Sequence, residues 1–169
     1  MGYTSYLEKY EIIRVTPTLS TDAYAAGDVA FTATEIPNAV REDGGCSKIV
    51  NCFILDQDRD TFDLNLIFTE KNTAIGTINA TADISDANME AIGFCGMNFF
   101  QSDAAASGHI DNVRIMKQQS LSGASESVEP ILIQAEAGSR SVYVSGIFPD
   151  GTPTFAAADD IDIILHIEK

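Results

Sequence analysis

Three aspartates alternate with other residues along one short stretch of the chain, at Asp56, Asp58 and Asp60. Alternating carboxylates can converge on one hard cation, because Ca²⁺ binds several oxygen ligands in a flexible geometry. The EF-hand calcium loop also needs a glycine after its third ligand and a bidentate glutamate at its end, and this chain has Thr61 and Asn65–Ile67 at those places. We therefore favour an exposed acidic turn and expect no metal site, with the three aspartates as the candidate ligands if a metal does bind.

Catalysis by a nucleophile or a general base often depends on histidine, and the chain has two histidines, His109 and His166. His166 alternates with apolar residues, which predicts a position on the outward face of the last strand, and His109 begins a strand after a glycine. The sequence contains no G-x-S-x-G nucleophile elbow, no H-E-x-x-H metal motif and no glycine-rich phosphate loop. We therefore expect a protein that is not an enzyme and that uses no cofactor.

The chain is strongly acidic: its 169 residues include 25 Asp and Glu against 10 Lys and Arg, for a formal net charge of -15. Phosphate backbones and anionic membrane surfaces are bound by clustered Lys and Arg, so this balance argues against nucleic acid and membrane as direct partners. We interpret the acidic residues as a solvated exterior that keeps the protein soluble. A chain of this length fits one domain and can bury a core without metals or disulfides.

The three cysteines, Cys46, Cys52 and Cys95, have neither the even number of a disulfide framework nor the spacing of a zinc site. We expect free thiols that pack as small apolar side chains. The first residues, MGYTSYLEKYEIIR, have no basic region followed by an apolar stretch, so we predict no signal peptide. No apolar run approaches the ~20 residues of a membrane-spanning helix. These features favour a soluble protein that folds in a reducing compartment.

Apolar and polar residues alternate along much of the chain, as in half-buried strands, because successive side chains leave a strand on opposite faces. Two clear series are Phe62, Leu64, Leu66, Phe68 and Ile161, Ile163, Leu165, Ile167. The pattern predicts strands at Glu11–Thr16, Asp28–Ile36, Lys48–Leu55, Thr61–Thr69, Gly93–Gln101, Ile110–Met116, Glu129–Ala135, Ser141–Phe148 and Ile161–Ile167. Lys48–Leu55 is apolar on both faces, so we expect it in the centre of a sheet, followed by a tight hairpin at Asp56–Asp60.

These strands predict an all-β fold: a two-sheet antiparallel sandwich, jelly-roll-like, with one short helix. We place the helix at Asp86–Ile92, with Ser85 as its N-cap and acidic residues near the positive end of its dipole. Residues 11–169 would form this single domain. An immunoglobulin-type sandwich is the alternative, although the chain has no tryptophan and no paired cysteines to support it.

Tyrosines gather at the amino terminus, where Tyr3, Tyr6, Leu7 and Tyr10 have the i, i+3, i+4, i+7 spacing of one helix face. We assign residues 1–10 to an aromatic arm. A helix this short is not stable alone in water, so it must dock, either on the edge of its own sandwich or on a neighbouring subunit. These four residues are our candidate interface, since tyrosine offers a large contact area with a polar tip.

Three stretches, PTLSTDAYAAGDV, GGCSKIVNCFILDQD and FAAADDIDIILHIEK, resemble small virion proteins of tailed bacteriophages of aquatic hosts, of the kind that decorate or cement the capsid. The resemblance lies in style, length and β-rich patterning over most of the chain. It implies a jelly-roll-like subunit without enzymatic activity, as a trimer or other homo-oligomer, on the outside of a head shell. The implied partner is the major capsid protein, and the implied location is the virion after synthesis in the host cytoplasm.

Two other functions stay open. One is a receptor- or carbohydrate-binding β-sandwich of a phage tail or baseplate, which would need exposed aromatic side chains, such as Tyr143 or Phe155, as stacking platforms. The other is a cupin-type enzyme, which would need clustered histidines and carboxylates on inner strand faces, whereas the chain has two histidines in all. We therefore predict a non-enzymatic virion structural protein that decorates or cements the capsid exterior through protein–protein contacts.

Overall fold

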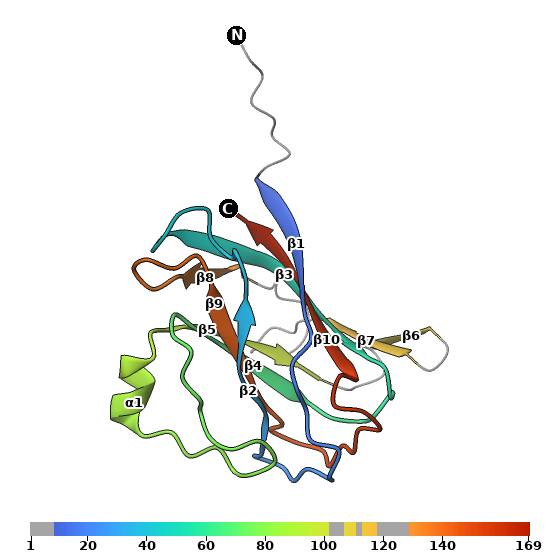
Figure 1. Cartoon of the computed structure of the whole chain (residues 1–169). Helices are drawn as coiled ribbons and strands as arrows, with labels where there is room; N and C mark the ends of the chain where they lie inside the picture. The colour runs from blue at the N-terminus through green and yellow to red at the C-terminus, as the bar shows by residue number, and fades with distance from the viewer. Residues whose placement is uncertain (1–8, 102–106, 111–112, 118–128) are drawn as a thin grey trace.

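Two antiparallel sheets pack face to face, with one short helix beside the smaller sheet in the described part of the chain (Figure 1). The structure is a computed structural model that describes residues 9–101, 107–110, 113–117 and 129–169. The larger sheet has six strands and the smaller sheet has four. The predicted all-β, two-sheet antiparallel sandwich with one short helix is confirmed.

The six-stranded sheet has the order β1-β10-β3-β7-β6, and β8 also pairs with β3. Its strands are β1 (Tyr10–Val15), β3 (Cys46–Asp56), β6 (Ser107–Ile110), β7 (Val113–Lys117), β8 (Ile131–Gln134) and β10 (Ile161–Glu168). β3 pairs with β10 on one side and with β7 and β8 on the other, which confirms the central place predicted for Lys48–Leu55. β1 lies at the edge of the sheet and, among the described strands, pairs only with β10.

The four-stranded sheet has the order β2-β9-β4-β5. Its strands are β2 (Val29–Ile36), β4 (Leu64–Thr69), β5 (Phe94–Phe100) and β9 (Val142–Ile147). The helix α1 (Asp86–Ala91) directly precedes β5, and Ser85 caps it as predicted by accepting a hydrogen bond from the backbone N–H of Asn88. Within the described residues, no helix has the length and apolar character needed to cross a membrane.

Within each sheet, strands from the first part of the chain pair with strands from the second part, as in a long hairpin whose two arms fold over together. β1 pairs with β10, β2 with β9, β3 with β7 and β8, and β4 with β5. Consecutive strands from β1 to β4 therefore alternate between the two sheets, which makes the fold jelly-roll-like, as predicted. The tight hairpin predicted at Asp56–Asp60 is wrong, because β3 and β4 lie in different sheets and this turn carries the chain from one to the other.

A second prediction was wrong at Ile110–Met116, which is not one strand. Ile110 pairs with Val113, so the chain reverses between them and β6 and β7 form an antiparallel hairpin. The two intervening residues are Asp and Asn, which favour tight turns because their short side chains tolerate left-handed backbone. The apolar residues on both sides of this pair concealed the reversal in the sequence.

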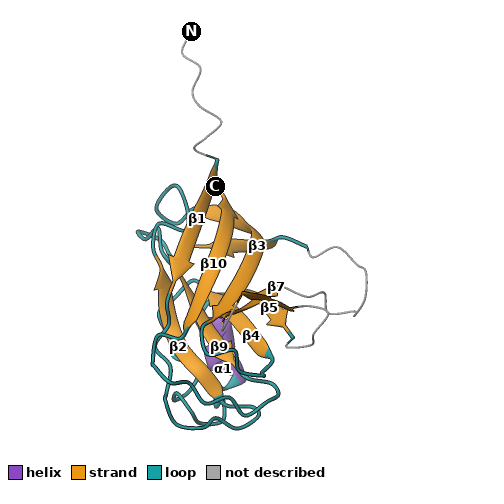
Figure 2. Ribbon diagram, turned by 90° about the vertical axis from the view of Figure 1, so that its right-hand side faces the viewer, coloured by secondary structure: helices purple, strands orange, loops and turns teal. Residues whose placement is uncertain are grey.

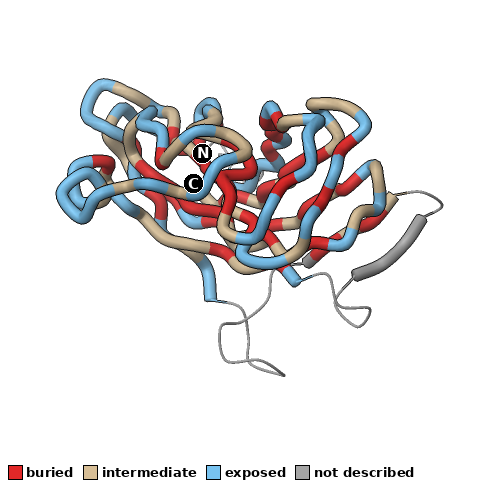
Figure 3. The backbone as a smooth tube through the Cα atoms, turned by 90° about the horizontal axis from the view of Figure 1, so that it is seen from below, coloured by how far each residue is buried: buried red, intermediate tan, exposed pale blue. Residues whose placement is uncertain are grey.

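The main core lies between the sheets, and buried residues alternate with less buried ones along parts of several strands, such as β10 (Figure 3). Both apolar series that predicted strands are buried there, Phe62 to Phe68 from β4 and its approach and Ile161 to Ile167 from β10. Phe62 also belongs to a cluster of four aromatic rings with Tyr24, Phe148 and Phe155. The centroids of the Tyr24 and Phe148 rings are 4.9 Å apart, in an edge-to-face arrangement that aromatic pairs prefer.

The hydroxyl of Tyr24 makes two hydrogen bonds inside this aromatic cluster. It donates to the carbonyl of Ala30 at 2.9 Å and accepts from the backbone N–H of Ser20 at 2.6 Å. Tyr24→Phe removes both bonds and should lower the free energy of unfolding by about 2 kcal/mol, because both backbone partners lose the buried hydroxyl. Urea denaturation measures this loss. Tyr143→Phe, at a half-buried position on β9, is the control and should stay within about 0.5 kcal/mol of the wild type.

Candidate functional site

The outer face of the six-stranded sheet is defined by its register. Directly opposite residues of antiparallel strands share a face, and Ile164 lies opposite both Arg14 and Phe53. Leu55, two residues along β3, lies opposite Ile115 of β7. All five side chains are on the side of the sheet that faces away from the core, while Ile163 and Leu165 of the same strand are 0% exposed on the other side.

Apolar residues run across this outer face on four adjacent strands. We call this set the apolar stripe: Ile115 on β7, Leu55 and Phe53 on β3, Ile164 on β10 and Ile12 on β1. Ile12 is 68% exposed, and the other four are half-buried. In Figure 2, β1, β10 and β3 lie side by side across the front of the molecule, so their part of the stripe crosses one continuous surface.

Polar groups border the apolar stripe on the same face. The imidazole of His166 lies beside Phe53, with ring centroids 5.4 Å apart, and is placed outward as the sequence predicted. Asp162 accepts hydrogen bonds from Arg14 at 2.9 Å and from the Thr16 hydroxyl at 2.5 Å. These contacts neutralise the Asp162 charge and fix Arg14 against β10, so the stripe has a polar rim, as protein interfaces do.

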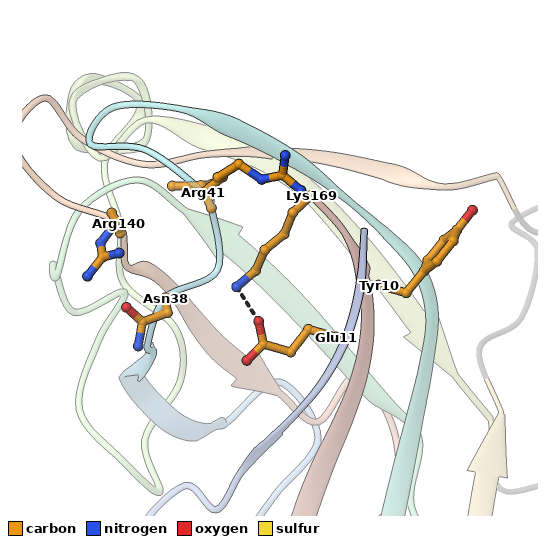
Figure 4. Close-up of a pocket in the computed structure, with 7 residues that line it drawn as sticks. Tyr10, Glu11, Asn38, Arg41, Arg140 and Lys169 are labelled. Atoms are coloured by element: carbon orange, nitrogen blue, oxygen red, sulfur yellow. Dashed lines mark hydrogen bonds and ion pairs between the residues drawn. The ribbon is translucent and has the colours of Figure 1, made fainter. Parts of the chain in front are cut away.

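A hollow of about 470 Å³ lies between β1 and the loops that follow β2 and precede β9. Figure 4 shows Asn38 and Arg140 on one side of it and Glu11 and Lys169 on the other. Two backbone hydrogen bonds hold the loops together: Val40 N–H donates to the Arg140 carbonyl at 3.2 Å, and Gly44 N–H donates to the Ser139 carbonyl at 2.8 Å. The hollow is an open depression, and these two hydrogen bonds fix the loops that form one of its walls.

Cations are concentrated around this hollow and a smaller one of about 230 Å³ beside it. Five of the ten Lys and Arg residues line the two hollows: Lys9, Arg41, Lys48, Arg140 and Lys169. Several of these cations are in ion pairs, Lys169 with Glu11, Lys9 with Glu168, and Arg140 with Asp43 at 3.8 Å. The hydrogen bond and charge of Glu168 raise the pKa of Lys9, and Lys9 in turn lowers the pKa of Glu168. This end of the molecule thus presents both signs of charge.

The predicted acidic turn is held by hydrogen bonds to its own backbone and to the segment 154–156. Asp58 and Asp60 accept hydrogen bonds from the N–H groups of Ala156 and Thr154, and Asp56 accepts from the N–H groups of Asp58 and Arg59 at 3.1 and 3.0 Å. The turn was predicted to be exposed, and this is wrong at Asp56, which is 0% exposed. Across the described residues, no three His, Cys, Asp or Glu side chains are grouped as metal ligands would be.

Asp56 also faces Arg114, its directly opposite neighbour on β7, on the inner side of the sheet. Asp56 is 0% exposed and Arg114 is 7% exposed. One carboxylate oxygen of Asp56 and two guanidinium nitrogens of Arg114 have no hydrogen-bond partner within the described structure. Burial raises the pKa of Asp56 to about 6, against the opposing effects of its two backbone hydrogen bonds and of Arg114.

Neither the histidines nor the cysteines form a reactive cluster in the described structure. β10, which carries His166, and β6, which carries His109, are separated in the sheet by β3 and β7. The three cysteines are free; Cys52 is buried, as predicted, whereas the prediction of a packed thiol is wrong for Cys46, which is exposed. Burial raises the pKa of Cys52 and Cys95 above the ordinary thiol value. A buried or half-buried thiol with a raised pKa is a weak nucleophile at neutral pH.

The candidate interface at the amino terminus is described only in part. Tyr3, Tyr6 and Leu7 lie outside the described residues. Tyr10 is the first residue of β1, and its side chain is 60% exposed, so at this position the chain is a strand rather than the predicted helix. Figure 4 shows the Tyr10 ring directed away from the centre of the hollow.

Of the two aromatic side chains considered as platforms for carbohydrate binding, Phe155 is 1% exposed inside the aromatic cluster and Tyr143 is half-buried on β9. Phe155 therefore cannot serve as a stacking platform. The apolar stripe escaped the sequence reasoning, although the segment IDIILHIE contained a signal for it. Ile164 breaks the alternation of that strand by placing an apolar residue between Asp162 and His166 on the polar side.

Comparisons of this chain with known protein families, with curated proteins and with solved structures found no match.

Proposed function

We propose that this chain is a non-enzymatic structural protein that acts through protein–protein contacts made by the apolar stripe. The stripe is the observation that carries this proposal. One face of an antiparallel sheet in a sandwich packs on the core, and the other face is ordinarily polar because water covers it. Here apolar residues of four adjacent strands join on the outer face. A contiguous exposed apolar surface with a polar rim is typical of a site that binds another protein.

The setting that we propose is the exterior of a tailed-bacteriophage capsid, with the major capsid protein as the partner. This part of the proposal rests on the sequence resemblance and on the form of the molecule. A jelly-roll of paired strands keeps the stripe flat and fixed, so little conformational entropy is lost when it binds. Many copies of such a modest contact would add up over a shell. The strongly acidic remainder of the surface would stay in solvent.

The proposal predicts that lysine in the stripe weakens shell binding without unfolding the protein. Phe53→Lys and Ile115→Lys each place a charge in the apolar stripe. Each should weaken binding to purified capsid shells at least about tenfold, as measured by co-sedimentation. Both side chains are half-buried on the outer face, so circular dichroism should show the wild-type fold.

The matched control is Phe94→Lys, which changes an exposed aromatic residue on β5 of the other sheet and should bind like the wild type. Quantitative mass spectrometry of purified virions gives the number of copies of the chain in each particle. Absence of the chain from purified particles would contradict the capsid setting. Equal shell binding by Phe53→Lys and the wild type would contradict the role of the stripe.

A further inference from the structure

We infer that two copies of this chain pair edge to edge along β1, antiparallel and about a two-fold axis at Ile12, and so join their six-stranded sheets into one. This inference goes beyond the proposed function, because it concerns the edge of the sheet rather than its face. It also names the partner, a second copy of the chain. It stands whichever protein the apolar stripe binds.

Within the described residues, no strand pairs with the backbone groups that β1 presents at this edge. Lys169 N–H donates to the carbonyl of Lys9 at 2.8 Å, and the register continues from these two residues to Tyr10 opposite Glu168. In an antiparallel pair, residues alternate between those bonded to the partner strand and those whose backbone groups point away from it. The odd-numbered residues of β1 therefore bond to β10, and the N–H and C=O groups of Tyr10, Ile12 and Arg14 point to the open edge.

The other side of β10 supports this assignment independently. There Gln57 N–H donates to the carbonyl of Asp160 at 2.8 Å. Ile161 lies opposite Asp56, so the register places Asp160 opposite Gln57. Even-numbered residues of β10 therefore bond to β3, which leaves the odd-numbered ones, such as Ile163 and Ile167, to bond to β1. Both hydrogen bonds give the same alternation. Among the described strands, β10 is the only one that pairs with β1.

The side chains of β1 select a register for a second copy. In the joined sheet, the faces that cover the two cores must lie on the same side. An outer-face residue of one copy must therefore lie opposite an outer-face residue of the other. Pairing Ile12 with Ile12 of the second copy meets this condition and places Tyr10 opposite Arg14. Each of these residues points its backbone groups to the edge, so each pair can exchange two hydrogen bonds. The guanidinium of Arg14 is hydrogen-bonded to Asp162 on β10, so the exposed ring of Tyr10 would pack against the aliphatic part of the Arg14 side chain.

β1 lacks two of the features that ordinarily protect an edge strand. Proline, bulges, charged side chains and covering segments all hinder edges from pairing with other chains, and β1 has neither a proline nor a bulge, although it carries Glu11 and Arg14. The strand YEIIRV contains no proline or glycine, and its register with β10 is continuous. Tyr10 and Ile12 are 60% and 68% exposed. Its acidic residue, Glu11, is already paired with Lys169, which offsets a charge that would otherwise repel the second copy.

Sedimentation velocity tests the pairing over loading concentrations from about 1 to 500 µM, a range suited to a small interface. We expect the wild-type chain to dimerise, and Ile12→Lys to raise the dissociation constant at least about tenfold because two ammonium groups meet on the axis. Ile12→Pro should act in the same way by removing the N–H that points to the edge, while leaving the bonds to β10. The control Leu132→Lys, at a 57% exposed position on β8, should dimerise like the wild type.

A wild-type chain that stays monomeric at the highest concentration overturns the inference, as does an Ile12→Lys variant that dimerises like the wild type. If Ile12→Pro proves unfolded by circular dichroism, Ile12→Lys decides alone. Ile12 belongs both to the edge and to the apolar stripe. The variants at Phe53 and Ile115 change the stripe away from β1, so they distinguish a failure of the edge pairing from a failure of the stripe.

Cysteine cross-linking tests the register in a background in which Cys46 and Cys95 are changed to serine. Opposite residues of a hydrogen-bonded antiparallel pair have Cα atoms about 5.5 Å apart, within the range of a disulfide. Ile12→Cys should therefore form a disulfide-linked dimer under mild oxidation. Arg14→Cys, which would lie opposite Tyr10 rather than its own copy, should cross-link at least about ten times more slowly. Equal rates for the two variants would overturn the register.

Discussion

Replacing Gly146 with alanine should lower the free energy of unfolding by about 3 kcal/mol, because the added methyl group has no room. Gly146 lies on β9 directly opposite Phe31 of β2. A Cβ at this position would be 2.7 Å from Cζ of Phe31 and nearer still to Cε1. Phe31 is 0% exposed, so its ring cannot turn out into solvent and must push against the core instead. We expect an overpacked core rather than a local adjustment.

Urea denaturation of Gly146→Ala measures this loss, and Gly96→Ala is the matched control. Gly96 is also inside a strand, and a Cβ there would lie 2.7 Å from Cγ2 of Ile131, a single close atom on a half-buried side chain, whereas three atoms of the buried Phe31 ring are close to the Cβ at Gly146. The control should therefore lower the free energy of unfolding clearly less than Gly146→Ala does. In a Phe31→Leu background the cost of Gly146→Ala should fall to about 1 kcal/mol, because the ring that opposes the methyl group is gone. The same cost in both backgrounds would refute the clash.

The strands were predictable from the sequence because the constraint that produces them is local. Ile161, Ile163, Leu165 and Ile167 alternate since one face of β10 packs on the core, and this pattern can be seen without knowing the partners of the strand. Ser85 was predictable as an N-cap for the same reason, since its hydrogen bond reaches only to Asn88. The jelly-roll class followed from counting such local signals.

The order of the strands depends on contacts between distant residues, and there the local signals failed. The composition of Asp56–Asp60 marked a turn correctly, but a turn does not reveal which sheet the next strand joins. Ile110 and Val113 looked like one strand because both are apolar, whereas their pairing makes them the two ends of a reversal. In both places the sequence indicated the local conformation, a turn or a strand, but not which strand each residue pairs with.

The candidate site was invisible for the same physical reason. Phe53, Ile115 and Ile164 are separated by many residues in the chain, and only the register of β3, β7 and β10 brings them together. Phe53 and Ile115 alone each look like ordinary core residues, and Ile164 is the one of the three that breaks the alternation of its strand. The sequence did show that Lys48–Leu55 is apolar on both faces, but it could not show that one of those faces is turned outward.

Changing Asp56 to asparagine should produce the other large effect, which depends on pH. Asp56 is 0% exposed, and burial raises its pKa to about 6 from an ordinary value of 3.8. The folded protein therefore holds the proton on this carboxyl more tightly than the unfolded chain does. Its contribution to stability is fully present below about pH 4 and is lost as the pH rises through about 6. A shift of this size corresponds to about 3 kcal/mol.

Asparagine has the same shape and cannot titrate, and its side-chain oxygen can accept the same hydrogen bonds from Asp58 and Arg59. The free energy of unfolding of Asp56→Asn, relative to wild type, should therefore rise by about 3 kcal/mol between pH 4 and pH 7.5. All other carboxylates are common to both proteins, so the difference between them isolates Asp56. Denaturation of both proteins across this range provides the measurement, and a difference that does not change with pH would count against the shifted pKa.

A substitution at Arg114 tests which groups set the pKa of Asp56. Its positive charge faces Asp56 and lowers the pKa of that carboxyl, although burial and the nearby charge of Asp60 act in the opposite direction. Arg114→Gln should therefore move the titration of Asp56 to still higher pH, which carboxyl-selective NMR can follow directly. A midpoint that instead falls would mean that Arg114 does not stabilise the carboxylate. Asp56 and Arg114 lie opposite each other on the inner face where β3 ends, so the protonation of Asp56 changes the net charge buried at that end of the six-stranded sheet.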